Sequence, residues 1–305
     1  MHADGVIDDA TTSSALALDR GDVFSLHLEL RATMYAGVLL VMAGVGIVLA
    51  RNLERIGHLV LLLAIALAAA ACAVPAMRSR LADRPLNVVA DYLLLLAALL
   101  GSAGLAYAER QFVLLGPMWS WHLLLLAVLH AIVAYAFASR LVLAASLASL
   151  AGWFGLGGSA GDLLPFSYST PALGSRALAC AAIIAAWRHV DGRARADTTF
   201  SGVFDHFAAN LAFWGSLAWC LEWPWVAAGL PLLAALAYVS VRHGLGTGRE
   251  AFLVYGTLYA AIGVCFVTVP RLDGRTVSFG AVLIVVCAAA ATLWQLRRRL
   301  REPGP

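Results

Sequence analysis

Apolar segments of about 20 residues recur along this chain of 305 residues, and they limit what it can fold into more than any other feature. About 20 apolar residues are the length that a helix needs to cross the hydrocarbon core of a bilayer, which is roughly 30 Å thick. Only 13% of the residues are charged and 62% are hydrophobic, whereas an average soluble domain is about 25% charged. The pattern predicts an all-α, polytopic integral membrane protein.

Ten segments fit this description. They are residues 31–50, 57–77, 86–107, 118–139, 141–157, 173–190, 203–222, 224–242, 250–270 and 277–296. Two connections are very short, at Arg140 and at residues 222–224, and if either pair were one long helix the number would fall to nine or eight. The expected organisation is a cytosolic segment 1–30, five spans in 31–158, an outer loop 159–172, five spans in 173–296 and a basic cytosolic tail 297–305.

The distribution of arginine predicts the orientation, because the chain contains no lysine and all 21 basic residues are arginine. With ten spans, fifteen arginines fall on one side and six on the other. The side richer in basic residues faces the cytoplasm in membrane proteins, so both termini are expected there. A chain rich in alanine and arginine and without lysine indicates a bacterial source, so a bacterial inner (plasma) membrane is expected. Six of the nine tryptophans then lie at outer ends of spans: Trp119, Trp121, Trp153, Trp219, Trp223 and Trp225. Residues 1–21 carry four aspartates and no apolar core, so no signal peptide is expected.

Residues 157–161 read G-x-S-x-G, the pattern of a hydrolase nucleophile elbow around Ser159. That motif needs a strand before it and a helix after it, whereas here it follows an apolar helical segment. A rhomboid-type protease would need glycine where Ala160 stands. We therefore expect no catalytic residue and no enzyme. An intramembrane hydrolase ranks behind the two functions given at the end of this subsection. It would need a histidine within hydrogen-bond reach of Ser159, and His122 is the first candidate.

The five cysteines all lie in apolar segments and none is part of a C-x-x-C motif, so neither a disulfide framework nor a zinc site is expected. We also expect no other metal site and no cofactor.

Four polar side chains inside the segments are candidate pathway residues, because burying them in hydrocarbon is costly: Asp91, His130, His206 and Asn210. Each also has a structural interpretation. Asp91 follows Arg84 and Pro85, so it could pair with Arg84 or Arg80 near the inner surface.

The other candidates are histidine and asparagine residues in spans four and seven. His130 could relay protons or hold a metal with His122, or simply donate to a backbone carbonyl. His206 and Asn210 are one helical turn apart and could bond across helices.

Four stretches of the first half resemble a bacterial membrane-protein family, domain of unknown function 2157. They are GVIDDATTSSALALD (5–19), YAGVLLVMAGVGIVLARNLERI (35–56), YLLLLAALLGSAGLAYAERQF (92–112) and MWSWHLLLLAVLHAIVAYAFASRLVL (118–143). The resemblance covers about residues 5–158. It implies membrane helices and, because the family has no established activity, it implies no site residue.

The expected function is that of a non-enzymatic membrane scaffold or accessory subunit. The alternative is a secondary transporter of a small solute, similar to the drug/metabolite transporter superfamily in size and number of spans. Convergence of the four candidate residues on one water-accessible cavity would favour transport. Expected partners are the bilayer and a membrane protein or second copy, with no nucleic acid. Anionic lipids are expected at the basic tail, at Arg297, Arg298, Arg299 and Arg301.

Overall fold

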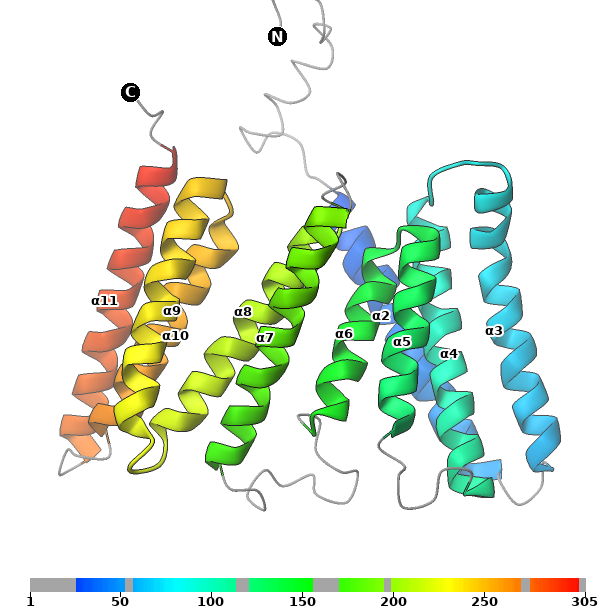
Figure 1. The fold of residues 1–305 in the computed structure, drawn as a ribbon, viewed down its shortest axis with the longest axis horizontal. Helices are drawn as coiled ribbons and strands as arrows, with labels where there is room; N and C mark the ends of the chain where they lie inside the picture. The colour runs from blue at the N-terminus through cyan, green and yellow to red at the C-terminus, as the bar shows by residue number, and fades with distance from the viewer. Residues whose placement is uncertain are drawn as a thin grey trace, which may run out of the picture. The chain divides into compact units, whose positions relative to one another are not determined.

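The computed structural model describes residues 26–52, 57–113, 121–155, 170–194, 199–269 and 275–301, and these ranges form ten α-helices and no strand (Figure 1). The helices are α2 (Leu26–Asn52), α3 (His58–Leu81), α4 (Val88–Phe112), α5 (Trp121–Phe137), α6 (Arg140–Trp153), α7 (Thr170–Ala194), α8 (Ser201–Cys220), α9 (Val226–Thr247), α10 (Glu250–Thr268) and α11 (Arg275–Arg301). Each of the ten expected segments overlaps one of these helices, so the all-α prediction is confirmed for the described residues.

Both short connections separate two helices, as the sequence predicts. Between α5 and α6, Ala138 has a φ of 53° and Ser139 begins the next helix by accepting the N–H of Val142 on its Oγ at 3.1 Å. Between α8 and α9 the chain turns between Cys220 and Val226. Neither pair is one long helix.

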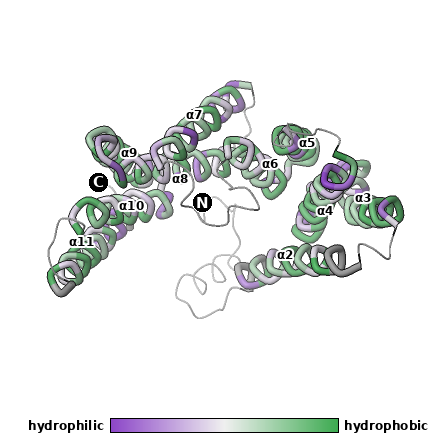
Figure 2. Tube along the Cα trace, turned by 90° about the horizontal axis from the view of Figure 1, so that it is seen from below, coloured by the Kyte–Doolittle hydropathy of each residue, from purple (hydrophilic) through white to green (hydrophobic). Residues whose placement is uncertain are grey.

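Within the described ranges, six helices are long and apolar enough to cross a membrane by length and composition: α3, α4, α7, α9, α10 and α11. At 1.5 Å per residue, α5 with 17 residues and α6 with 14 residues reach about 25 and about 21 Å, less than the hydrocarbon core. Hydrophobic residues surround most helices rather than following one face (Figure 2), as expected where lipid covers the outer surface.

The chain divides into two compact units, residues 1–116 and 117–305. The first contains α2 to α4, in which α4 packs against both α2 and α3. The second contains α5 to α11, each packed against its neighbour in the chain, with α8 also against α6 and α10. The sequence instead predicts two halves of five spans each, separated by loop 159–172. Residues 156–169 lie outside the described residues, so that division stays a prediction.

Helix α4 begins slightly later than expected, at Val88 instead of residue 86. The reason is Asn87, whose Oδ1 accepts the N–H of Ala90 at 2.7 Å and caps the helix. This places Asp91 in the first turn of α4. A carboxylate there is favoured by the partial positive charge of the helix N-terminus.

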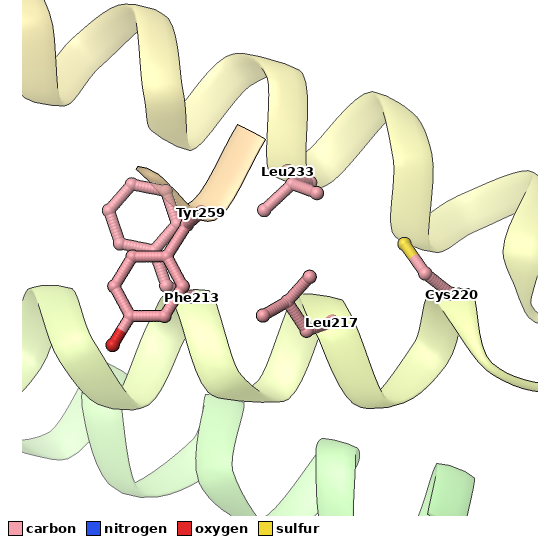
Figure 3. Packing of buried hydrophobic residues seen from close by; sticks show 5 residues of the cluster. All are labelled: Phe213, Leu217, Cys220, Leu233 and Tyr259. Carbon is pink, nitrogen blue, oxygen red and sulfur yellow. The ribbon is translucent and has the colours of Figure 1, made fainter. Parts of the chain in front are cut away.

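The core of the second unit lies where α8, α9 and α10 meet (Figure 3). Phe213 of α8 stacks on Tyr259 of α10, with ring centroids 4.6 Å apart. Leu217 and Cys220 of α8 and Leu233 of α9 complete this apolar cluster. The cluster fixes the separation of α8, α9 and α10. Of these, α8 and α10 carry the polar residues described below.

Helices α7 and α8 approach closely at Gly174 and Gly215. A Cβ added at Gly215 would lie 2.8 Å from the carbonyl oxygen of Gly174, and one added at Gly174 would lie 2.8 Å from the carbonyl oxygen of Gly215. The two backbones are therefore in contact, which is how small residues let membrane helices pack.

Candidate functional site

Polar side chains of α8 and α10 meet at successive levels across the interface between these helices. We call this set the polar ladder: Asp205, His206 and Asn210 of α8 with Arg249, which immediately precedes α10, and Tyr255 and Tyr259 of α10. On each helix the deeper two residues are one turn apart, so they lie on the same face. Two of the four candidate residues from the sequence, His206 and Asn210, belong to it.

The first level is an ionic cluster at the ends of three helices. The carboxylate of Asp205 accepts the Nε–H of Arg188 from α7 on Oδ1 at 2.9 Å and an Nη1–H of Arg249 on Oδ2 at 3.1 Å. The Asp205 side chain is 18% exposed, against 38% for Arg188 and 39% for Arg249. One carboxylate thus connects α7, α8 and the N-terminus of α10 by charge-assisted bonds.

The second level lies one residue further along α8. Nδ1 of His206 is 3.2 Å from the hydroxyl of Tyr255, and the tautomer of the ring decides which group donates. The His206 ring also stacks on Phe252, with centroids 5.0 Å apart and planes at 11°. The Tyr255 ring also meets the imidazole edge-on, with centroids 5.7 Å apart, so one hydrogen bond and two ring contacts from α10 hold His206.

The third level is an amide with both ends bonded. Tyr259 donates its hydroxyl to Oδ1 of Asn210 at 2.8 Å, and Nδ2 of Asn210 donates to the carbonyl of His206 at 2.8 Å. One turn further on, Phe213 stacks on Tyr259 and the apolar cluster begins. The ladder therefore ends against a packed core.

Replacing Tyr259 with phenylalanine should lower the free energy of unfolding by about 1 kcal/mol, because Oδ1 of Asn210 loses its donor while the ring packing is kept. Unfolding in mixed detergent and SDS micelles, followed by circular dichroism, measures the change. Tyr238→Phe is the matched control, since this tyrosine is 63% exposed on α9 and its hydroxyl accepts a long, exposed bond of 3.4 Å from Arg242, for which water can substitute. An equal effect of both substitutions would contradict the assignment of the bond.

The remaining candidates lie elsewhere. His130 is buried between α5 and α6, where its Nδ1 is 3.5 Å from Oγ of Ser149. Asp91 is half-buried and belongs to the first unit. Among the described contacts, the structure thus brings together His206 and Asn210 alone of the four. Within the described ranges no group of three or more His, Cys, Asp or Glu side chains could hold a metal ion. Ser159 lies outside these ranges.

The sequence analysis missed a second polar contact, between α5 and α7. Tyr135 donates its hydroxyl to Oδ1 of Asp191 at 2.9 Å and accepts the indole N–H of Trp187 at 3.0 Å. In the first unit, Nδ1 of His58 on α3 lies 2.7 Å from the hydroxyl of Tyr107 on α4. The partners are separated by about 50 residues in the chain, so no local spacing indicates these pairs.

Comparison with known proteins identifies a family for the first part of the chain. Residues 2–143 match the model of a family described as "Predicted membrane protein (DUF2157)", which confirms the resemblance found in the sequence. The match covers less than half of the chain and ends at the start of α6, so α7 to α11, including the polar ladder, lie beyond it. No curated protein and no solved structure matches the chain.

Proposed function

We propose that this membrane protein is a non-enzymatic scaffold or accessory subunit of a bacterial inner membrane. One observation carries the proposal. Among the described residues, no buried side-chain nitrogen or oxygen lacks a hydrogen-bond partner, and Asp205, His206 and Asn210 of the polar ladder each bond a side chain of another helix or of the residue that caps it. Polar groups used in this way hold a bundle together.

We further propose that all ten helices cross the membrane and that both termini face the cytoplasm. Within the second unit, ion pairs bring arginine-bearing helix ends to the same side. Arg188 of α7 and Arg249 at the start of α10 share Asp205, and Arg297 near the end of α11 lies 3.3 Å from Glu250 of α10. The positive-inside rule supports a cytoplasmic location for this side.

Helix α11 is the element best suited to bind another membrane protein. It packs against α10, and no residue of its membrane-length window is buried. Large apolar side chains such as Phe279 and Ile284 are exposed on it. A scaffold or accessory subunit needs such an accessible transmembrane surface for its partner.

Photocrosslinking in intact cells tests the scaffold proposal. A photoreactive amino acid replaces Phe279 or Ile284 in α11, and Ile183 of α7, also exposed, serves as the control position. We expect both α11 positions to yield one adduct of the same discrete protein mass, and the α7 position to yield lipid adducts. Lipid adducts alone at all three positions would contradict the proposal.

A proton-coupled transporter is the second candidate, and the polar ladder is the observation that favours it. The ladder places an aspartate, a histidine and two tyrosines in succession along α8 and α10, as a proton path requires. Reconstitution into vesicles that contain a pH-sensitive dye tests it. Proton flux that is absent from protein-free vesicles and is abolished by His206→Ala would establish this function over the scaffold, and no flux would remove it.

A further inference from the structure

A groove runs along the second unit between α7 and α9, with α8 as its floor. Its volume is about 420 Å³. Most of its lining is alanine and larger apolar side chains: Leu178, Ala181, Ala182 and Ala185 from α7, Ala208, Ala209, Ala212 and Phe213 from α8, and Leu236 and Val239 from α9. Val239 on its rim is 62% exposed, so the groove opens toward the surface that lipid covers.

One end of the groove is polar. Asp205, Ser240 and His243 line it there, and Phe252 closes it. Arg188 lies three residues beyond Ala185 on α7, so it continues the wall that Ala181 and Ala185 form. Arg249, the residue before α10, is bonded to Asp205.

The charge at this end is positive. Two arginines share the single carboxylate of Asp205, which leaves an excess of one positive charge. The other nearby carboxylates face other partners, since Asp191 accepts the hydroxyl of Tyr135 and Glu250 pairs with Arg297. Each guanidinium has five N–H donors and uses one of them on Asp205, so both have further donors for an anion.

An apolar groove that opens to lipid and ends at a cationic site has the chemistry of a phospholipid. We propose that it holds one acyl chain of an anionic phospholipid, whose phosphate is bound by Arg188 and Arg249. Charge complementarity selects an anionic headgroup over a zwitterionic one. The paired arginines also suit phosphate, because a guanidinium donates two parallel bonds to phosphate oxygens.

Native mass spectrometry of the full chain in detergent tests this site, with phosphatidylglycerol and phosphatidylcholine of the same acyl chains as probes. We expect the first phosphatidylglycerol to bind more tightly than phosphatidylcholine. Arg188→Gln and Arg249→Gln should each weaken phosphatidylglycerol binding about fivefold, the contribution of one basic side chain beside an anionic lipid. Arg297→Gln is the control for general surface charge, and an equal loss there would overturn the proposal.

A second pair of variants tests the acyl chain. Ala182→Trp fills the groove from an exposed position, whereas Ile183→Trp places the same side chain on another exposed face of α7, about 100° round the helix and outside the lining. Both chains should fold, and only Ala182→Trp should weaken phosphatidylglycerol binding. The water-soluble headgroup, glycerophosphoglycerol, should not compete at equal concentration. Competition by the headgroup, or equal effects of the two tryptophans, would show that no acyl chain occupies the groove and would overturn the proposal.

Discussion

Replacing Gly215 with valine should separate α7 from α8 and lower the free energy of unfolding by about 2–3 kcal/mol, which is typical of overpacking a tight contact. The new Cβ would lie 2.7 Å from Cγ of Leu178 and 2.8 Å from the backbone oxygen of Gly174. A backbone atom cannot rotate away, so the helices must move apart. Unfolding in mixed SDS micelles measures the loss.

The control for this substitution is Gly280→Val on α11, where an added Cβ meets nothing within 4 Å. Valine is a slightly better helix former than glycine, so the stability of this variant should be unchanged or slightly raised. If Gly215→Val were as stable as Gly280→Val, the close approach of α7 and α8 would be wrong.

Replacing Asp205 with alanine should cost about 2 kcal/mol of stability. The substitution removes two charge-assisted bonds and leaves Arg188 and Arg249 facing each other without the carboxylate between them. A single bond to a charged group contributes about 1.5–3 kcal/mol. The partial exposure of both arginines reduces the total, because water screens their charges.

The matched control is Glu250→Ala, which breaks the exposed pair with Arg297 and should cost less than about 0.5 kcal/mol. A double-mutant cycle then isolates the bond between Asp205 and Arg249. We expect Asp205→Ala and Arg249→Ala together to destabilise the protein by less than the sum of the two single effects. Additive effects would show that the two side chains do not interact.

The positions of all ten helices could be predicted from the sequence because membrane helices have a fixed minimum length and apolar composition. The α5–α6 connection was also predictable, since Arg140 interrupts an apolar run. The number of helices that cross the membrane was harder to predict. Helix α8 carries Asp205, His206 and Asn210, which lower its mean hydropathy, and α5 and α6 are shorter than the bilayer core.

The polar ladder was only half predictable. One-turn spacing marked His206 and Asn210 on α8, but their partners Tyr255 and Tyr259 are 49 residues away in the chain. One signal was present, since the two tyrosines are also four residues apart. Two helices with polar residues at the same spacing can align them in pairs, although the spacing does not say which helices meet. Which helices meet depends on tertiary packing. Phe213 against Tyr259 joins α8 to α10, and Gly174 against Gly215 joins α7 to α8.

The central claim is that the deep level of the polar ladder, where Asn210 meets Tyr259, is a dry, closed contact in a membrane protein whose arginine-rich helix ends are cytoplasmic. An impermeant thiol reagent tests both parts, with single cysteines replacing Asn210, Thr247 or Trp223 in a chain without its five native cysteines. We predict labelling of position 223 in intact cells, of position 247 in inside-out vesicles only, and of position 210 in neither. Labelling of position 210 from either side would contradict the claim, because it would show that water reaches the ladder.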